Sequence, residues 1–381
     1  LFFVTLVMLA KRARHPIIPA AVIAVASFSP LILVYQGIVW KDVLFANMAV
    51  FAFALLQDAN ERTLSQRRAR IGLYLAALAM AGLSALVRQN GILVPLCMAA
   101  AIAGLEMRPQ NVSRRLGRFV GVFAVSMAVA MASGVLASNV LRVTAVSPPA
   151  DATHLGLETL FGYDVVAIAA TTGQSAYPAF TARGIDPVAF ESHAKEVYTP
   201  ERLDYIAGSA AMGAELSHLR GQGMGGIWRD LVTQNPSAYL AHRFSVLREL
   251  LLPTNPSKCL PIHVGVGGPE ALMKELDITP GLRPTDKALY VYSTHFFGTG
   301  LMTPLTYLGL AVVLLAGLAV RPRRAHIPVA AMLASAIAFA LSFVAIGIAC
   351  DFRYVYYLVT ADVAALVYLS ALGWRRARQA A

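Results

Sequence analysis

Apolar runs of about 20 residues, the length that crosses the hydrocarbon core of a bilayer, recur in both terminal parts of this chain. The chain is 57% hydrophobic and only 14% charged, whereas soluble domains average about 25% charged residues. A soluble fold of 381 residues could not bury so much apolar surface. We therefore expect an all-α polytopic membrane protein with about eight full transmembrane helices.

The expected full spans share a low charge and a polar boundary at each end; they are residues 16–35, 43–57, 71–87, 92–105, 119–139, 298–320, 327–349 and 354–372. Residues 1–10 add a partial first span. The chain begins inside this apolar run without an initiator methionine. We therefore expect that it lacks its natural start.

Residues 140–297 differ in composition from the rest. They hold 12 of the 32 basic and 15 of the 21 acidic residues, so we expect one large, water-facing domain inserted before the last three spans. The predicted division is thus an N-terminal transmembrane module (1–139), this loop domain (140–297) and a C-terminal transmembrane module (298–381). Proline after a capping residue predicts helix starts at Asp186, Thr199 and Asn235, which makes the domain mainly helical.

The basic residues predict the topology. Alternate connections, at 11–15, 58–70, 106–118, 321–326 and the C-terminal tail, carry 17 of the 32 basic residues. The short connections between them carry only Lys41, Arg88 and Arg353. An excess of Lys and Arg marks the cytoplasmic side, so the C-terminus is expected in the cytoplasm and the large domain outside. The same bias explains the net charge of +11 without a nucleic-acid partner.

Three short polar turns interrupt apolar runs on the expected outer side. They are Trp40-Lys41-Asp42, Arg88-Gln89-Asn90 and Asp351-Phe352-Arg353-Tyr354. Charges at the ends of spans are costly unless they face water, a partner or a substrate. A solvated span end, or a local ion pair of Asp351 with Arg353, is the simpler interpretation of any one turn. Three such turns on one face instead predict a shared polar site.

The residue types in these turns suit phosphate and sugar chemistry. Asp42 can act as a general base or metal ligand, and Lys41 can supply a point charge to phosphate. Arg88 can bind phosphate in bidentate fashion, and Asn90 can donate or accept hydrogen bonds. Asp351 with Arg353 repeats the combination of an acidic and a basic side chain. Tyr354 adds a ring for stacking and a hydroxyl, and Asp351 a second acid.

The three cysteines and the histidines show no metal-ligand spacing. Cys97 lies in an apolar run, and Cys259 and Cys350 are the one pair that could form a disulfide. An odd, sparse set of cysteines is more often inert, so we expect these two to stay unpaired. No metal site is predicted from spacing.

Four motifs in their order resemble those of bacterial integral-membrane glycosyltransferases of the GT-C superfamily, and in particular its glycosyltransferase-like membrane families. They are Trp40-Lys41-Asp42, Arg88-Gln89-Asn90-Gly91, the stretch from Asn235-Pro236 to His242-Arg243, and Asp351-Phe352-Arg353-Tyr354. The order covers most of the chain, although each motif is short.

The resemblance implies an enzyme of the bacterial inner membrane. Such an enzyme transfers a sugar from a polyprenyl-phosphate donor to a glycan, lipid or protein acceptor on the periplasmic face, in some cases with a divalent cation. Asp42 matches the acidic position of the second outer loop and is the catalytic candidate. Lys41, Arg88, Asn90, Arg243, Asp351, Arg353 and Tyr354 are the substrate-binding candidates. The acidic residue that similar enzymes carry in the first outer loop is expected before Leu1.

Two other functions fit the same composition. An O-antigen polymerase or ligase would rely on arginines of the large domain, of which Arg220, Arg229, Arg243 and Arg248 are candidates. A transporter or flippase of lipid-linked sugars would carry polar residues within its spans. The spans here are nearly free of charge, with Asp362 as the clear exception, and the sequence shows no internal repeat. Both points disfavour the transporter.

Overall fold

The computed structural model describes residues 1–381 except 12, 14, 108–111, 145–151, 222, 269 and 378–381. The described residues are nearly all helical and contain two isolated β-bridges but no β-strand. The predicted all-α class is therefore confirmed. Arg12, Arg14, Arg108 and Arg378 of the expected basic connections lie outside the described residues.

Five of the described helical segments are long and apolar enough to cross a membrane, or six if a bent pair forms one span. The five are Lys41–Glu61, Arg67–Val87, Ser113–Val143, Arg324–Ile346 and Phe352–Leu372. Two further apolar segments, Gln89–Leu105 and Pro304–Val320, are shorter. The structure therefore supports several helices that could span a membrane, but it does not confirm the predicted count of about eight.

The chain divides into two compact units. Unit 1 comprises Leu1–Thr144, Pro261–Ala340 and Arg353–Ala381, and unit 2 comprises Ala145–Leu260 and Leu341–Phe352. Residues 261–297, which composition groups with the loop domain, thus belong to unit 1.

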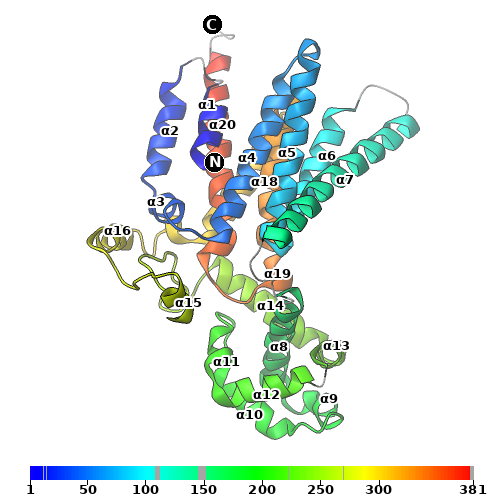
Figure 1. Cartoon of the computed structure of the whole chain (residues 1–381), viewed down its shortest axis with the longest axis vertical. Coiled ribbons are helices and arrows are strands. Elements are labelled where there is room, and N and C mark those ends of the chain that lie inside the picture. Colours follow the sequence, from blue (N-terminus) through cyan, green and yellow to red (C-terminus); the bar gives the residue numbers. More distant parts are fainter. Residues whose placement is uncertain are drawn as a thin grey trace. The chain divides into compact units, whose positions relative to one another are not determined.

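Unit 1 is a bundle of apolar helices with two short helices in its 261–297 segment. In chain order they are α1 (Phe2–Ala10), α2 (Ile17–Ser27), α3 (Pro30–Gln36), α4 (Lys41–Glu61), α5 (Arg67–Val87), α6 (Leu93–Leu105), α7 (Val112–Thr144), α15 (Glu270–Glu275), α16 (Pro284–Thr294), α17 (Pro304–Val320), α18 (Ile327–Leu341) and α20 (Tyr356–Ala377). Helix α4 packs against α5 and α20, and α5 packs against α7 (Figure 1).

Close approach of α5 and α7 requires glycine at position 82. A Cβ atom there would lie 2.0 Å from the carbonyl oxygen of Ala130 and 2.5 Å from Ser133 Oγ. Small residues at such contacts let membrane helices pack backbone to backbone.

The predicted span at 16–35 is broken. Helices α2 and α3 meet at an angle of 72°. Proline lacks an N–H and disfavours the helical conformation in the residue before it. Ser29 is accordingly extended, and Pro30 opens α3 at its first turn. The carbonyl oxygen of Phe28, freed by the break, accepts a hydrogen bond of 2.6 Å from the hydroxyl of Tyr292 in α16.

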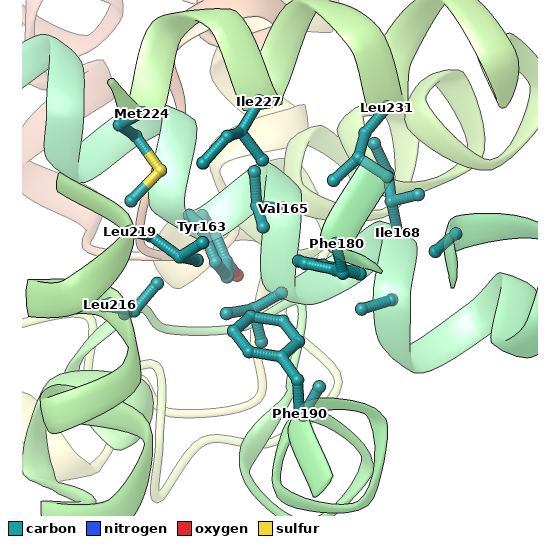
Figure 2. Close-up of a cluster of buried hydrophobic side chains, with 14 of the residues drawn as sticks. Tyr163, Val165, Ile168, Phe180, Phe190, Leu216, Leu219, Met224, Ile227 and Leu231 are labelled. Carbon is teal, nitrogen blue, oxygen red and sulfur yellow. The ribbon is translucent and has the colours of Figure 1, made fainter. Parts of the chain in front are cut away.

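Unit 2 is built around one central helix. Its helices are α8 (Ala152–Thr172), α9 (Tyr177–Thr181), α10 (Pro187–Val197), α11 (Asp204–Gly208), α12 (Ala210–Gly221), α13 (Met224–Gln234), α14 (Pro236–Leu251) and α19 (Phe343–Ile346). Helix α8 packs against α10, α13 and α14. Figure 2 shows its side chains Tyr163, Val165 and Ile168 in the buried apolar cluster with residues of the surrounding helices.

Two of the three predicted helix starts in unit 2 are confirmed. Asp186 caps α10 by accepting hydrogen bonds from the amides of Val188 and Ala189, and Asn235 precedes α14. The start predicted at Thr199 is wrong, because the next helix begins at Asp204. The intervening residues instead hydrogen-bond to a distant segment, where the amide of Leu203 donates to the Ile348 carbonyl over 2.9 Å.

Candidate functional site

The first turn of α4 positions Asp42. Trp40 is the N-cap residue in an extended conformation, Lys41 begins the helix, and Asp42 follows. An acidic side chain near a helix N-terminus is stabilised by the unpaired amides there. Asp42 is only 4% exposed, whereas Lys41 is exposed. The sequence-predicted catalytic acid is therefore held inside the protein, next to an exposed lysine.

The end of α5 positions Arg88. It is the C-cap residue, again extended, and a cation is favoured at the negative end of a helix. The guanidinium forms an ion pair with the carboxylate of Asp42, and the Arg88 side chain is 12% exposed. Burial lowers the pKa of Arg88, and the charge of Asp42 opposes this effect. Arginine keeps its proton under all these influences, so the site holds a partly desolvated cation.

The connection after Arg88 is a tight 3₁₀ turn, η2 (Gln89–Ile92). Asn90 lies in this turn and is partly buried. Gly91 is tightly enclosed, because a Cβ there would lie 3.1 Å from both the Cα of Ala85 and the ring of Phe45, so a larger residue would require these neighbours to shift. The Asn-Gly pair thus keeps the connection short and holds Arg88 close to α4.

The 3₁₀ turn η6 (Phe352–Val355) adds the third group of candidate residues. The guanidinium carbon of Arg88 lies 4.8 Å from the centre of the Tyr354 ring, and that of Arg353 lies 5.2 Å from the same ring. Arg353 also lies 4.8 Å over the ring of Trp40. All three separations fit cation–π contacts. Three turns far apart in the sequence therefore meet.

An imidazole joins them. His263 packs edge-on to Trp40 with ring centres 5.1 Å apart. We call Trp40, Asp42, Arg88, His263, Arg353 and Tyr354 the arginine–aromatic cluster. All six belong to unit 1. It contains two guanidinium groups and one carboxylate, an arrangement suited to a multiply charged anion such as a phosphate.

An aromatic stack and an amide pair underlie this cluster. Tyr35 stacks on Tyr356 at 4.7 Å and donates a hydrogen bond of 2.8 Å to the Pro261 carbonyl. Gln36 and Asn47 exchange two hydrogen bonds of 3.0 Å through their amide groups, and Gln36 Nε2 also donates to the hydroxyl of Tyr356. Sequence reasoning missed His263, Tyr35 and this amide pair. Only Gln36 and Asn47 gave a signal, as amides in otherwise apolar stretches.

Two of the predicted substrate-binding residues belong to unit 2. Arg243 is 1% exposed, lies 2.5 Å from Asp164 Oδ1 and donates to the Gly347 carbonyl. Trp228 donates to the other oxygen of Asp164 over 2.7 Å. These contacts give Arg243 a part in the internal packing of unit 2.

Asp351 is also 1% exposed, and it pairs with Arg202 at 3.1 Å. Arg202 further donates to the Lys258 carbonyl. The remaining arginines considered for a polymerase, Arg220, Arg229 and Arg248, are exposed.

Cys259 and Cys350 form a disulfide, which overturns the expectation that both stay unpaired. The amide of Cys350 also donates to the Glu201 carbonyl over 2.9 Å. The bond joins residues 91 positions apart, a separation from which the sequence gives no local signal. Cys97 is free.

Among the described residues, no three His, Cys, Asp or Glu side chains come together as a metal site would require. The one acid of the arginine–aromatic cluster is held by an arginine. The residues present therefore do not fit a divalent cation, and we derive no step through one.

No protein-family model, curated protein sequence or solved structure matches this chain.

Proposed function

We propose that the chain is a membrane glycosyltransferase that moves a sugar from a polyprenyl-phosphate donor to an acceptor on the extracytoplasmic face. One observation carries the proposal: Arg88 and Arg353 both lie against the ring of Tyr354, and Arg88 is paired with Asp42. A carboxylate beside two guanidinium groups provides the base and the anion-binding groups that such a transfer needs.

The ion pair suggests how donor binding prepares the base. The donor phosphate binds Arg88 and Arg353, and it competes with Asp42 for the Arg88 guanidinium. Asp42 then accepts the proton of the acceptor hydroxyl, whose oxygen forms a bond to the anomeric carbon. The bond from that carbon to the phosphate oxygen breaks, and its electron pair stays on the phosphate between the two arginines. Lys41 and Asn90 belong to the same turns and would contact the sugar or the phosphate.

Two features support an extracytoplasmic location. The disulfide between Cys259 and Cys350 is of the kind that persists in oxidising compartments. The basic residues also fall in alternate connections, which favours a cytoplasmic C-terminus and an outward-facing large domain. A bacterial inner membrane, with the acceptor in the periplasm, fits both features.

Binding of a polyprenyl phosphate to the full chain in lipid nanodiscs tests the anion site. Arg88→Ala and Arg353→Ala should each weaken binding at least tenfold, because a hydrogen bond to a charged group contributes about 1.5–3 kcal/mol. Arg68→Ala, an exposed arginine of unit 1, is the control and should bind as the wild type does. The matching polyprenol, which lacks the phosphate, should not distinguish the variants. Equal phosphate affinity in all four proteins would remove the proposed site.

Transfer activity tests the base. Asp42→Asn should retain phosphate binding but lose sugar transfer from radiolabelled polyprenyl-phosphate sugars to endogenous acceptors in membrane vesicles. Full activity of Asp42→Asn would contradict the assigned role. Loss of activity in Arg220→Ala, Arg229→Ala or Arg248→Ala alone would favour a polymerase or ligase instead.

A further inference from the structure

Unit 1 also contains a cavity whose lining includes none of the residues of the arginine–aromatic cluster. It has a volume of about 940 Å³ and is lined by residues of α2, α3, α16, α17 and α20 and of the segments between them. This volume lies within the range of about 300–1,000 Å³ that is usual for small-molecule sites. Exposed apolar side chains, Ile17 at 78% and Val25 at 75%, lie along it. In a bilayer the groove would therefore open towards lipid.

An acid lines this apolar groove. Asp362 lies in α20 and is 1% exposed. Neither of its carboxyl oxygens has a hydrogen-bond partner in the described part of the chain. The described lining residues include no lysine, arginine or histidine. Burial of an unpaired carboxylate is strongly unfavourable, and an ionisable residue within a membrane span usually marks a functional site.

Aromatic rings line the same groove. They belong to Phe28, Tyr292, Phe296 and Tyr307. Tyr292 and Phe296 pack edge to face at 5.3 Å, and the hydroxyl of Tyr292 is fixed to the helix break at Phe28. Aromatic faces attract organic cations, most strongly where water is excluded.

We propose that this groove binds a lipophilic organic cation, with the positive charge against Asp362 and the hydrocarbon groups against the apolar and aromatic walls. The carboxylate supplies the opposite charge, the rings supply cation–π contacts, and the open apolar side admits the ligand from the bilayer. The site is independent of the proposed transfer reaction.

The chemistry of the lining favours this class over other ligands. An anionic lipid headgroup would meet a carboxylate and no cation. An alkali or alkaline-earth ion needs several oxygen ligands, whereas the groove offers one carboxylate and a few hydroxyl groups, of which those of Tyr292 and Tyr307 already donate to backbone carbonyls. A neutral hydrocarbon chain would leave the acid without a partner.

Binding of tritiated tetraphenylphosphonium to the full chain in nanodiscs of zwitterionic lipid tests the proposal. The wild type should bind one equivalent saturably. Tetraphenylborate, which has the same shape and the opposite charge, should show no saturable binding when it is measured in separate samples. Asp362→Asn, which keeps the shape and removes the charge, should weaken binding at least tenfold. Asp277→Asn makes the same change at an exposed position of unit 1 and should have no effect.

A second variant keeps the test informative if Asp362→Asn does not fold. Ala24 lines the groove on α2 and is exposed, so Ala24→Trp should fill the groove and abolish saturable binding without touching the acid. Equal affinity in the wild type and Asp362→Asn, saturable binding of tetraphenylborate, or absence of saturable tetraphenylphosphonium binding to the wild type would each overturn the proposal.

Discussion

The guanidinium of Arg88, at the end of α5, pairs with the carboxylate of Asp42, in the first turn of α4. Each charge is also favoured where it stands by the partial charges at its helix end. The pair therefore has a structural role in joining two helix ends, in addition to the chemical role proposed for it. The two roles can be measured separately, because the structural role appears in the free energy of unfolding and the chemical role in phosphate binding and sugar transfer.

A double-mutant cycle measures the structural role. Arg88→Gln should lower the free energy of unfolding by about 3 kcal/mol, because it removes the cation that forms an ion pair with the buried carboxylate of Asp42. The double variant Asp42→Asn/Arg88→Gln should lose less than the sum of the single variants, with a coupling of about 1–3 kcal/mol. Titration with dodecyl sulfate in mixed micelles gives the free energy of unfolding of the wild type, the two single variants and the double variant. Asp277→Asn combined with Arg88→Gln is the control, and the changes in the free energy of unfolding should add in this pair. Additive changes for Asp42→Asn and Arg88→Gln as well would contradict the coupling.

Replacement of Gly82 in α5 should destabilise the packing of α5 against α7. Gly82→Ala places a methyl group 2.0 Å from the carbonyl oxygen of Ala130, so α5 and α7 must separate. We expect a loss of about 3 kcal/mol in the same titration. Gly72→Ala is the matched control on the same helix, because a Cβ there meets nothing within 4 Å, and alanine is the better helix former. A stable Gly82→Ala variant would show that the helices pack less closely than described.

The disulfide should stabilise unit 2. Cys259→Ser or Cys350→Ser should lower its stability by about 2–5 kcal/mol, since the bond closes a long loop. Faster proteolysis of unit 2 in intact vesicles would show this. Dithiothreitol should reproduce the effect in the wild type and add nothing to Cys259→Ser. Cys97→Ser removes the free cysteine and should change the rate of proteolysis neither with nor without dithiothreitol. A wild-type rate of proteolysis that does not respond to dithiothreitol would contradict the prediction.

The sequence predicts part of the candidate site because charge at the end of an apolar run is a strong signal. Asp42, Arg88 and Arg353 stand at such positions and Tyr354 follows Arg353, and the structure brings the four together. The sequence gives no comparable signal for a charged residue that is buried in an internal ion pair. Arg243 stands in a motif that resembles a family pattern, yet its partner Asp164 lies on another helix and only the tertiary structure reveals the pair.

The fold shows the same limit. Composition indicates apolar helices, and proline with a capping residue indicates starts such as Asp186. Pro30 is a local signal for the break in the expected span at 16–35, but composition and length alone do not distinguish a broken apolar run from a straight span. The disulfide and the contact of His263 with Trp40 depend on chain segments far apart in the sequence, so no local pattern predicts them.

Unit 2 should lose stability in mild acid because of His242. This side chain is 3% exposed, its Nε2 lies 3.2 Å from Asp164 Oδ1, and its Nδ1 shares a hydrogen bond of 3.0 Å with Tyr198. Burial lowers the pKa of His242; Asp164 raises it, and the charge of Arg243 lowers it further. The folded state therefore binds this proton less readily than the unfolded state, in which the pKa is about 6.5.

The sign of the pH dependence follows. Between the lowered pKa and about 6.5 the unfolded state binds more protons, so stability is complete above about pH 6.5 and falls as the pH falls through the folded-state pKa. The slope cannot exceed about 1.4 kcal/mol per pH unit for one proton. Hydrogen exchange of the α8 and α14 amides from pH 7.5 to 5, corrected for intrinsic exchange, measures it. His242→Gln should flatten this profile of stability against pH. His218→Gln, at an exposed position, should leave the profile unchanged. A wild-type profile without slope would show that the buried imidazole does not control the stability of unit 2.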